Sequence, residues 1–475
     1  MSKLTRREFL EESLLATAVA AALPVLPGEA MGRTVTPSSP NEAIRVGVIG
    51  VRGRGRAHIV DFLKSKDSEV VAICDPDEGV TGLARKAAPR AKYYRDIRKM
   101  LEDDSIDAVS IATPNHWHSL ATIWAVQAGK HVFVEKPISQ NVAEGRVVVE
   151  ASQKHGRLVQ HGTQARSHKA TMEAMDWLHA GGLGKIHVAR GLCYKRRKSI
   201  GKVEGAQKPP ATLDYDLWTG PAEMQPLMRK NLHYDWHWVW NTGNGDIGNQ
   251  GVHQMDIARW GLGKMVFPNR VMSCGGRLGY EDDAETPNTH ISVFDYGDQK
   301  IVFEVRGLKT GPYRTATIGT IFHCEHGYLV SASYSKVLAF DRDGKLMKTF
   351  TGGGNHIQNF LDAVKSGKES DLNSGPLEGH LTAALCHLGN IPYRLGQSRK
   401  LSATDTPFGE TEVANETFRR FRSHLEENGF DASRTDYQAG PILTLDPSTE
   451  QFKGAHAAQA NSLLTRKNRA PFLVK

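Results

Sequence analysis

The stretch "GVIGVRGRGRAHI" (residues 47–59) decides the fold of the first domain. It overlaps a β-rich apolar run at 44–50 and leads into a segment with the apolar periodicity of a helix. A strand that enters a helix through a glycine-rich turn can hold the pyrophosphate of a dinucleotide, because N–H groups at the helix N-terminus face the phosphates. The stretch therefore predicts a dinucleotide-binding turn.

The glycines of this turn depart from the usual G-x-G-x-x-G spacing. Gly50, Gly53 and Gly55 supply the tight turn and the close backbone approach. Arg52 occupies the place of the second glycine, and two interpretations stay open: its guanidinium lies along the phosphates, or it points into solvent. Asp75 ends the next predicted strand, where an acid accepts hydrogen bonds from ribose hydroxyls and repels a 2′-phosphate. The pattern favours NAD over NADP.

Strands and helices alternate as far as residue 165. Apolar runs of strand type at 69–75, 107–114 and 130–137 are separated by helical patterns. Repeated strand–helix–strand units form a doubly wound parallel sheet. We therefore expect an α/β Rossmann domain over residues 44–165.

From residue 166 the pattern changes to strands joined by short turns. Hairpin turns are predicted at 296–298 and 342–344, which indicates an open, mostly antiparallel sheet. Together with several helical patterns this predicts an α+β substrate and oligomerisation domain over residues 166–400. The polar, irregular residues 401–475 are expected to form a C-terminal extension that wraps this domain or an oligomer partner.

The N-terminal 30 residues have the layout of a signal peptide. Arg6 and Arg7 precede an alanine-rich apolar stretch at 14–26, and a small-x-small cleavage site follows at 28–30. The apolar stretch is too short for a confident membrane span. We therefore expect export through the twin-arginine pathway to the periplasm or cell envelope, with residues 31–43 as a linker.

Composition excludes several other classes. The formal charge is +8, but the basic residues are dispersed except at 195–198, which we interpret as a solvated loop, and no nucleic-acid module is visible. The five cysteines are widely spaced and form no C-x-x-C pair, which indicates buried, reduced thiols rather than disulfides or a zinc site. No metal is expected.

Four motifs match those of a known family. They are the glycine turn, "ATPNHWH" (112–118), "EKP" (135–137) and "GNGDIGNQGVHQMDIARWGLG" (243–263). On these motifs the chain resembles the Gfo/Idh/MocA oxidoreductases from residue 44 to about 400. The resemblance implies an NAD(P)-dependent oxidoreductase acting on a CH–OH group of a sugar, inositol or glycoside. It also implies a homo-oligomer formed through the open sheet.

The resemblance places Lys136 beside the nicotinamide as the catalytic lysine. A lysine at the carboxyl end of a parallel strand also lies where such sheets bind ligands, and its ammonium can stabilise a developing alkoxide. His253 is suited to accept the hydroxyl proton. Asn249, on the same helix face, is a further catalytic and substrate-binding candidate: it stands where the family usually has Asp, can still hydrogen-bond a substrate hydroxyl, but cannot carry that charge. Which residue is the base stays open: Asp246 or Asp256 could contribute, although we interpret Asp256 as structural.

The resemblance also implies further contacts in the loops after the strands. His118 is read as a packing residue at a helix start. Gln164 and Arg166, just past a domain-crossing strand, are candidate substrate contacts. The implied cofactor contacts besides the turn and Asp75 are Thr113, Asn115, His116 and Glu135.

The tract "HYDWHWVWN" (233–241) is rich in aromatic residues. A metal site of His233, His237 and His253 is disfavoured, because Trp236, Trp238 and Trp240 alternate with period two. Aromatic faces beside polar groups suit a sugar ring, so Trp238 is a candidate substrate contact, with core packing as the alternative.

These features give a leading function and two alternatives. The leading one is NAD-dependent oxidation or reduction of a secondary hydroxyl of a sugar, inositol or glycoside. Because free NAD is scarce outside the cytoplasm, export predicts a tightly retained NAD. The alternatives are redox-neutral, NAD-dependent cleavage of a glycoside and a non-catalytic sugar-binding protein.

Overall fold

The computed structural model describes residues 43–402 and 404–475. The predicted signal peptide and the linker up to residue 42 lie outside the described residues. Within the described part, no helix is long and apolar enough to cross a membrane.

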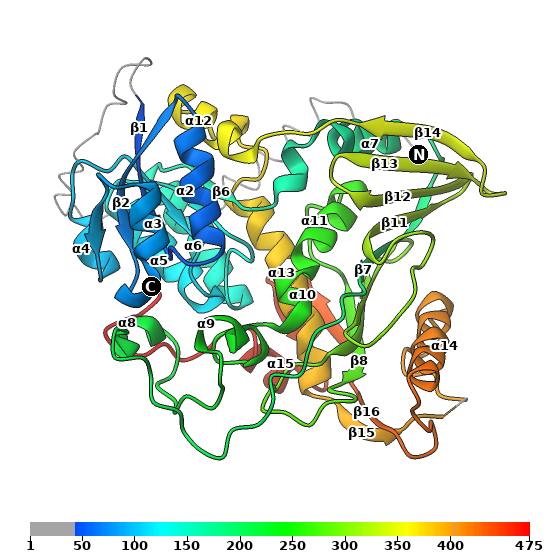
Figure 1. Cartoon of the computed structure of the whole chain (residues 1–475). Helices are drawn as coiled ribbons and strands as arrows, with labels where there is room; N and C mark the ends of the chain where they lie inside the picture. The colour runs from blue at the N-terminus through cyan, green and yellow to red at the C-terminus, as the bar shows by residue number, and fades with distance from the viewer. Residues whose placement is uncertain (1–42, 403) are drawn as a thin grey trace, which may run out of the picture. The chain divides into compact units, whose positions relative to one another are not determined.

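A parallel sheet of six strands forms the core of the first domain, between residues 44 and 161 (Figure 1). The strand order is β3-β2-β1-β4-β5-β6, so the direction of winding reverses between β1 and β4, where such sheets bind ligands. The predicted Rossmann fold is confirmed. The strands are β1 (Ile44–Ile49), β2 (Ser68–Cys74), β3 (Lys92–Tyr94), β4 (Ala108–Ile111), β5 (His131–Val134) and β6 (Val159–His161).

Helices cover both faces of this sheet. One apolar core lies under α2 (Arg54–Lys64) and α3 (Gly82–Ala87), and the other lies under α4 (Ile97–Leu101), α5 (Asn115–Gln127) and α6 (Val142–His155). These two cores fix the carboxyl ends of the strands and the loops that follow them.

Helix α12 (His356–Ser366) joins the first of these cores from far along the chain. Its Phe360 is fully buried with a ring centroid 5.8 Å from that of Phe133 in β5. The sequence assigned α12 to the second domain by its position, but its apolar face completes the first domain (Figure 1).

The second domain is built on a mixed sheet of twelve strands within the described residues. The main order is β14-β13-β12-β11-β7-β10-β9-β8-β16-β15, and β7 and β10 pair in parallel. The predicted, mostly antiparallel sheet is confirmed, and both predicted hairpin turns join neighbouring antiparallel strands. The strands are β7 (Ile186–Cys193), β8 (Arg270–Gly276), β9 (Thr289–Asp295), β10 (Lys300–Arg306), β11 (Ile318–Cys324), β12 (Gly327–Ser333), β13 (Lys336–Asp341), β14 (Leu346–Thr351), β15 (Gln397–Lys400), β16 (Asp436–Ala439), β17 (Leu443–Asp446) and β18 (Gln451–Lys453).

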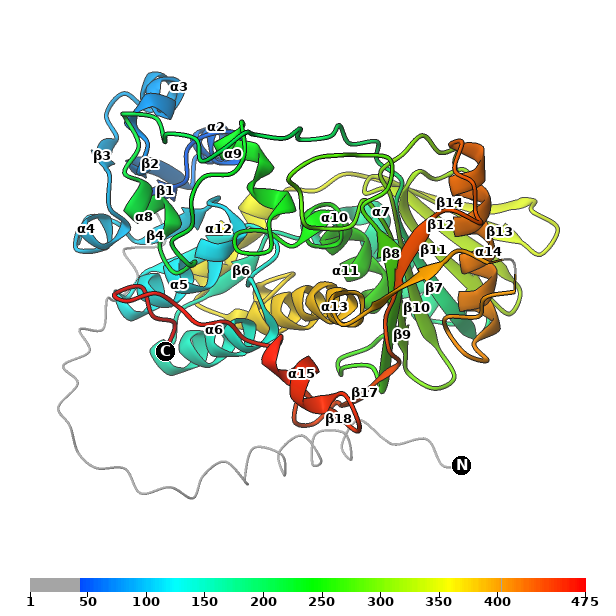
Figure 2. The same cartoon turned by 90° about the horizontal axis from the view of Figure 1, so that it is seen from below.

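Helices also lie on both faces of the second sheet (Figure 2). On the inner face, α7 (Lys169–His179), α11 (Gly251–Gly261) and α13 (Pro376–Arg394) share the largest apolar core. On the outer face, α14 (Glu412–Glu427) packs Phe418 and Phe421 against the sheet. The open sheet that was expected to form oligomers is therefore covered in part by a helix of this same chain.

The C-terminal extension is more ordered than its polar sequence suggests. Beyond α14 and α15 (Ala457–Ser462), it runs back to the first domain (Figure 1). There Arg466 Nε donates to Glu144 Oε1 at 2.7 Å, and the ring of Phe472 lies 5.5 Å from that of Trp117. The extension therefore wraps its own chain.

Residues 199–244, which we call the insertion loop, cross from β7 to α10 (Gly245–Asn249). The loop contains α8 (Tyr215–Thr219), α9 (Leu232–Asp235) and a short 3-10 turn at 236–238. The Asp214 N–H donates to the carbonyl of Pro76 at 3.0 Å, which fastens the loop above the carboxyl end of β2. The loop thereby covers the first sheet at the carboxyl end of β2.

Two predictions from composition have different outcomes. All five cysteines are free, and four of them are buried, as expected. The basic run at 195–198 is not simply a solvated loop, because Arg197 Nη2 donates to the buried Asp246 Oδ1 at 2.7 Å.

Candidate active site

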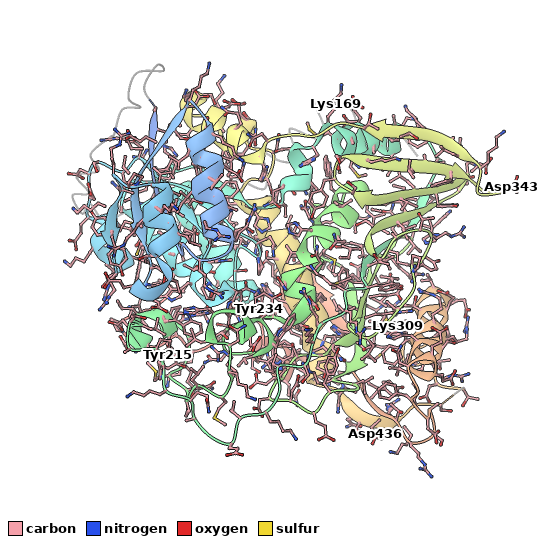
Figure 3. All side chains as sticks on the ribbon, in the orientation of Figure 1. Lys169, Tyr215, Tyr234, Lys309, Asp343 and Asp436 are labelled. Carbon is pink, nitrogen blue, oxygen red and sulfur yellow. The ribbon has the colours of Figure 1, made fainter. Side chains whose placement is uncertain are left out.

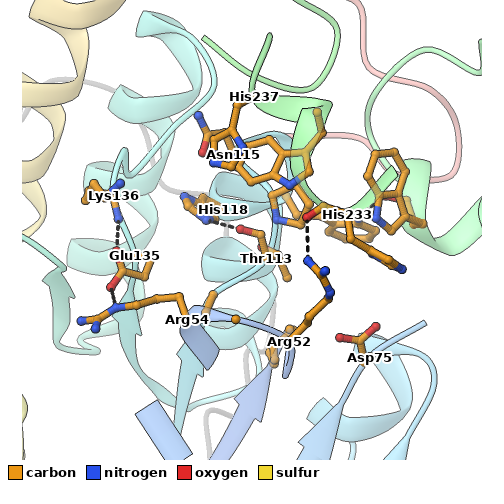
Figure 4. A pocket seen from close by; sticks show the side chains of 18 of the residues that line it. Arg52, Arg54, Asp75, Thr113, Asn115, His118, Glu135, Lys136, His233 and His237 are labelled. Atoms are coloured by element: carbon orange, nitrogen blue, oxygen red, sulfur yellow. Dashed lines mark hydrogen bonds and ion pairs between the residues drawn. The ribbon is translucent and has the colours of Figure 1, made fainter. Parts of the chain in front are cut away.

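A cavity of about 740 Å³ lies at the carboxyl ends of the first sheet (Figure 4). Its walls come from the glycine turn, the loops after β4 and β5, the insertion loop, α10 and α11, and the turn between β12 and β13. Pockets of this size hold small molecules and cofactors.

The glycine turn has the backbone that a dinucleotide site needs. Gly50 has a φ of +80°, and a Cβ there would lie 2.8 Å from the carbonyl carbon of Ala112. A Cβ on Gly55 would lie 1.7 Å from the Gly50 oxygen, so Gly55 allows the helix to pack on the turn. Gly53 precedes α2 without a side-chain cap, and the Gly55 N–H donates to the Arg52 carbonyl at 3.1 Å, which leaves other first-turn N–H groups of the helix for an anion. These residues fit a pyrophosphate.

Asp75 follows β2 at the same edge. Its carboxylate accepts hydrogen bonds from the N–H groups of Val51 and Asp77, each at 3.0 Å. Burial raises the pKa of Asp75 from 3.8 to about 6, although these two hydrogen bonds oppose the increase. Asp75 therefore lines the cavity as a carboxyl group that ionises at a higher pH than a free aspartate.

Lys136 projects into the cavity just after β5. Its Nζ donates to the backbone carbonyl of Asn249 at 2.7 Å, so the ammonium is tied to the end of α10. Burial lowers the pKa of Lys136, and the nearby charge of Glu135 limits the decrease. This lysine is held at the point where both domains meet the cavity.

Glu135 is the anion beneath Lys136. It accepts from Arg54 Nε at 2.6 Å and from Gln164 Nε2 at 3.3 Å, and lies 3.1 Å from His58 Nε2. Burial opposes its ionisation, but the hydrogen bond to His58 and the charge of Arg54 hold the pKa of Glu135 well below its usual range. Glu135 is thus a fixed negative charge that organises this end of the cavity (Figure 4).

His253 lies on α11, and its Nδ1 is buried without a hydrogen-bond partner among the described residues. Burial lowers the pKa of His253 to about 3, and the charge of Lys136 contributes to the decrease. The imidazole is therefore neutral near pH 7 and can accept a proton. Asn249, four residues earlier, lines the same cavity.

The two aspartates that could have acted as the base are engaged elsewhere. Asp246 pairs with Arg197, and the fully buried Asp256 accepts two hydrogen bonds from Arg166 Nε, at 3.0 and 2.9 Å. Neither lines the cavity. Of the residues weighed as the base, His253 is therefore the one that lines the cavity.

Both domains match sequence models of one family. Residues 44–163 match its "Oxidoreductase family, NAD-binding Rossmann fold" model, and residues 183–426 match its "Oxidoreductase family, C-terminal alpha/beta domain" model. The chain belongs to the Gfo/Idh/MocA family. The resemblance drawn from the four motifs is therefore confirmed for both domains, and the first domain of this Gfo/Idh/MocA protein is an NAD-binding one.

Several relatives of this family member act on sugars or inositols by name. Inositol 2-dehydrogenase of Salmonella paratyphi B is 31% identical over 154 residues, 32% of this chain and 46% of that protein. Alpha-N-acetylgalactosaminidase of Shewanella oneidensis is 34% identical over 122 residues, 24% of this chain and 27% of that protein. The matched segments thus span less than half of these relatives.

A solved structure shares the fold. Levoglucosan dehydrogenase, in complex with NADH and levoglucosan, superposes with a TM-score of 0.57 at 17% identity, over 74% of this chain and 96% of that one. At that identity the likeness shows the fold of the Gfo/Idh/MocA protein and not its substrate.

Most of the residues predicted for the site lie together. The structure brings eleven of them to the wall of the one cavity, and four lie outside it. The lining residues are Gly50, Arg52, Gly53, Asp75, Thr113, Asn115, Glu135, Lys136, Gln164, Asn249 and His253; those outside are Gly55, His116, Arg166 and Trp238.

Three of the four are corrections, because buried partners turn their side chains away. The His116 ring is fully buried, with Nε2 3.0 Å from the carbonyl of Trp218. Arg166 forms the buried ion pair with Asp256 described above. Trp238 packs under the guanidinium of Arg197, 5.3 Å from its ring centroid. These three side chains pack behind the residues that line the cavity and do not line it themselves.

His233 and His237 of the aromatic tract line the cavity, where they contact neighbouring side chains. His233 Nε2 lies 2.8 Å from Asp77 Oδ2, and the His237 ring stacks on Trp236 at 3.6 Å. Residues 236–238 form a 3-10 turn and not the extended segment that period two suggested. Within the described residues, no group of three His, Cys, Asp or Glu side chains could hold a metal ion.

Tyr334 is the main residue that sequence reasoning missed. It lies in the turn between β12 and β13, lines the cavity, and its ring centroid is 5.8 Å from that of His253. Its hydroxyl forms no hydrogen bond with the described residues and is thus available to a ligand. His118 also lines the cavity, with its ring nitrogens 2.5 and 2.8 Å from the carbonyls of Pro137 and Thr113.

The raised pKa of Asp75 predicts that NAD binding weakens in acid. The ionised carboxylate is the form that accepts hydrogen bonds from ribose hydroxyls, and it is lost as the pH falls through about 6. We expect affinity to be constant above about pH 7 and about tenfold weaker one unit below the pKa. The fraction of nucleotide retained after desalting at a series of pH values measures this.

Asp75→Asn is the control for this prediction. The amide does not titrate in this range, so binding should be weaker throughout and independent of pH between about 5 and 8. The same acid dependence in Asp75→Asn would assign the effect to another group.

Proposed function

We propose that this Gfo/Idh/MocA protein oxidises or reduces a secondary hydroxyl carbon of a sugar, inositol or glycoside with NAD. The observation that carries the proposal is that Lys136 and His253, from different domains, line one cavity with the glycine turn and Asp75. A cationic donor, a neutral base and a dinucleotide turn are together what hydride transfer at a carbinol requires.

Each side chain has a defined task in this chemistry. NAD, when bound, supplies the hydride acceptor or donor. Lys136, held by the Asn249 carbonyl, directs its remaining N–H donors at the substrate oxygen and stabilises negative charge there. His253 accepts the hydroxyl proton in oxidation and returns it in reduction. The side chain of Asn249 can bond a neighbouring hydroxyl.

Tyr334 is expected to orient the substrate. Tyr334→Phe removes only the free hydroxyl, so we expect KM to rise about three- to tenfold while NAD retention is unchanged. Steady-state kinetics on the active sugar measures this. Tyr328→Phe is the matched control, because Tyr328 stacks on Phe340 and does not line the cavity. Equal kinetics in both variants would remove Tyr334 from the substrate site.

We also propose that NAD is retained and that the protein works after twin-arginine export to the periplasm or cell envelope. The insertion loop supports retention: Arg52 Nη1 donates to the His233 carbonyl at 3.3 Å, and His233 contacts Asp77. A dinucleotide under this loop leaves only when the loop opens. Denaturing the purified mature protein and finding no nucleotide would contradict retention.

Redox-neutral cleavage of a glycoside is the second candidate. It is favoured by the same closed loop, because a retained cofactor must be regenerated in place, and by the glycosidase among the relatives. Here transient oxidation acidifies the neighbouring C–H, the aglycone leaves, water adds and the hydride returns. The overall redox state of the sugar does not change.

One screen tests these functions. The mature protein with its own nucleotide is mixed with a panel of sugars, inositols and glycosides, and nicotinamide absorbance and products are followed. A ketone product with lasting reduction supports the dehydrogenase, and a free aglycone with no lasting absorbance change supports cleavage. If no compound changes the absorbance or is converted, the non-catalytic sugar-binding alternative is favoured.

A further inference from the structure

A second, smaller cavity is lined mainly by residues of the insertion loop. Its volume is about 360 Å³, and Trp218 lines both cavities. Tyr215, labelled on α8 in Figure 3, lines the second cavity, whereas Tyr234 on α9 lines the first. The second cavity is therefore separate from the residues proposed for hydride transfer.

A buried arginine with two nitrogens that lack a hydrogen-bond partner among the described residues lines this cavity. Arg229 is 6% exposed, and its Nε and Nη2 have no hydrogen-bond partner among the described residues. Its guanidinium lies over the face of Trp218, with the central carbon 5.2 Å from the ring centroid, and the carboxylates of Asp235 and Glu285 act on its charge from a distance. Buried N–H groups without an acceptor are costly, so these two nitrogens call for an acceptor from outside the chain.

A second unpartnered group lines the same cavity. Thr219 is 2% exposed, and its Oγ1 has no hydrogen-bond partner among the described residues. Arg229 and Thr219 thus line the same cavity, are both more than nine-tenths buried, and carry polar atoms without a hydrogen-bond partner among the described residues.

The rim carries the opposite charge. The carboxylates of Glu223, Asp283 and Glu285 line the cavity near its mouth. Each already accepts one hydrogen bond, for instance Glu285 Oε2 from the Trp240 N–H at 2.6 Å, and each keeps further acceptor capacity. The rim would repel an anion, and Arg229 would repel a cation.

We propose that this cavity is a second carbohydrate site that binds a neutral, polyhydroxylated ring. Hydroxyl groups can donate to the rim carboxylates while a hydroxyl or ring oxygen accepts from Arg229 and Thr219. Buried hydrogen bonds to a charged group supply most of the specificity of such a site. The choice of a carbohydrate among neutral polyols rests on the proposed function, whereas the position and polarity of the site do not.

The test is a binding measurement on the mature, cofactor-loaded protein. D-Glucose, D-galactose and myo-inositol are used as probes in saturation-transfer NMR, in a His253→Phe background that removes a sugar contact from the main cavity. We expect at least one probe to bind. Adding Arg229→Met or Thr219→Val should weaken that binding about tenfold or more, whereas the exposed control Arg196→Gln should not.

The two variants keep the test decisive. Valine has nearly the same shape as threonine, and Thr219→Val removes a hydroxyl that has no hydrogen-bond partner among the described residues. This variant therefore tests the site even if Arg229→Met fails to fold. Binding that is equal in all variants, binding of acetate or phosphate in place of the neutral probes, or no binding would each overturn the proposal. Because the readout is binding and not nicotinamide absorbance, the second site and the proposed function can fail separately.

Discussion

Replacing Lys136 by methionine should lower the rate of hydride transfer by about 10²–10³-fold. Lys136 lines the cavity just after β5, and its ammonium donates to the Asn249 carbonyl at the end of α10 at 2.7 Å. Methionine keeps the length and apolar contacts of the side chain but cannot stabilise charge on the substrate oxygen. The measurement is a single turnover of the retained nicotinamide with the active sugar, followed by absorbance.

Lys130→Met is the matched control. Lys130 stands at the opposite end of the same strand, is buried, and donates to the carbonyl of Asp103 at 2.9 Å. Its loss should reduce stability without slowing the single turnover. Equal rates for Lys136→Met and wild type would contradict the assignment of Lys136, and equal losses in both lysine variants would indicate damage to the domain.

Replacing His253 by glutamine should lower the same rate by about 10²–10⁴-fold. Glutamine can still form hydrogen bonds at this position but cannot take up the proton. Because burial lowers the pKa of His253 to about 3, its neutral form is present at all pH values above that. The rate should therefore not decline as the pH falls through 6.5, the ordinary value for histidine. A pH profile of the single turnover tests both points.

His168→Gln is the control for packing. The ring of His168 lies 5.7 Å from that of Tyr334, much as His253 does, but His168 does not line the cavity. It should leave the rate near that of wild type. If the single-turnover rate declines as the pH is lowered through 6.5 in wild type but not in His253→Gln, His253 titrates at its ordinary value.

The sequence could predict the residues of this site whose positions follow from the direction of the parallel strands. Gly50, Asp75 and Lys136 each follow a parallel strand, and all such strands end at the same edge, so their meeting there needs no further information. His253 and Asn249 were expected to share one helix face because they are four residues apart. The structure divides this stretch at Gln250, so Asn249 ends α10 and His253 lies on α11, yet both residues line the cavity.

The rest depends on partners that are distant in sequence. Arg166 and Trp238 are turned from the cavity by Asp256 and Arg197, which lie 90 and 41 positions away. A local pattern carries no sign of such a pair. Tyr334 reaches the cavity only because a hairpin turn of the second sheet lies beside α11, and nothing in its own neighbourhood distinguishes it from a surface tyrosine.

The fold shows the same limit. β14 was implied only by the predicted turn at 342–344, because its own residues are mostly exposed and lack an apolar alternation. α12 was predicted as a helix, but its own sequence does not say which core its apolar face will join, and only the assembled domain shows that it packs beside α2.

The return of the extension to the first domain sets an order of assembly during synthesis. Arg466 Nη2 donates to the carbonyl of His116 across 350 positions, and Phe472 backs Trp117, which lines the main cavity. The ribosome delivers the glycine turn early and these residues more than three hundred positions later. The nucleotide-binding domain therefore cannot reach its final form while it emerges, although domains usually fold in order from the N-terminus. The packing behind Trp117 forms only after the whole second domain has been made, so the finished wall of the main cavity is a late product of synthesis.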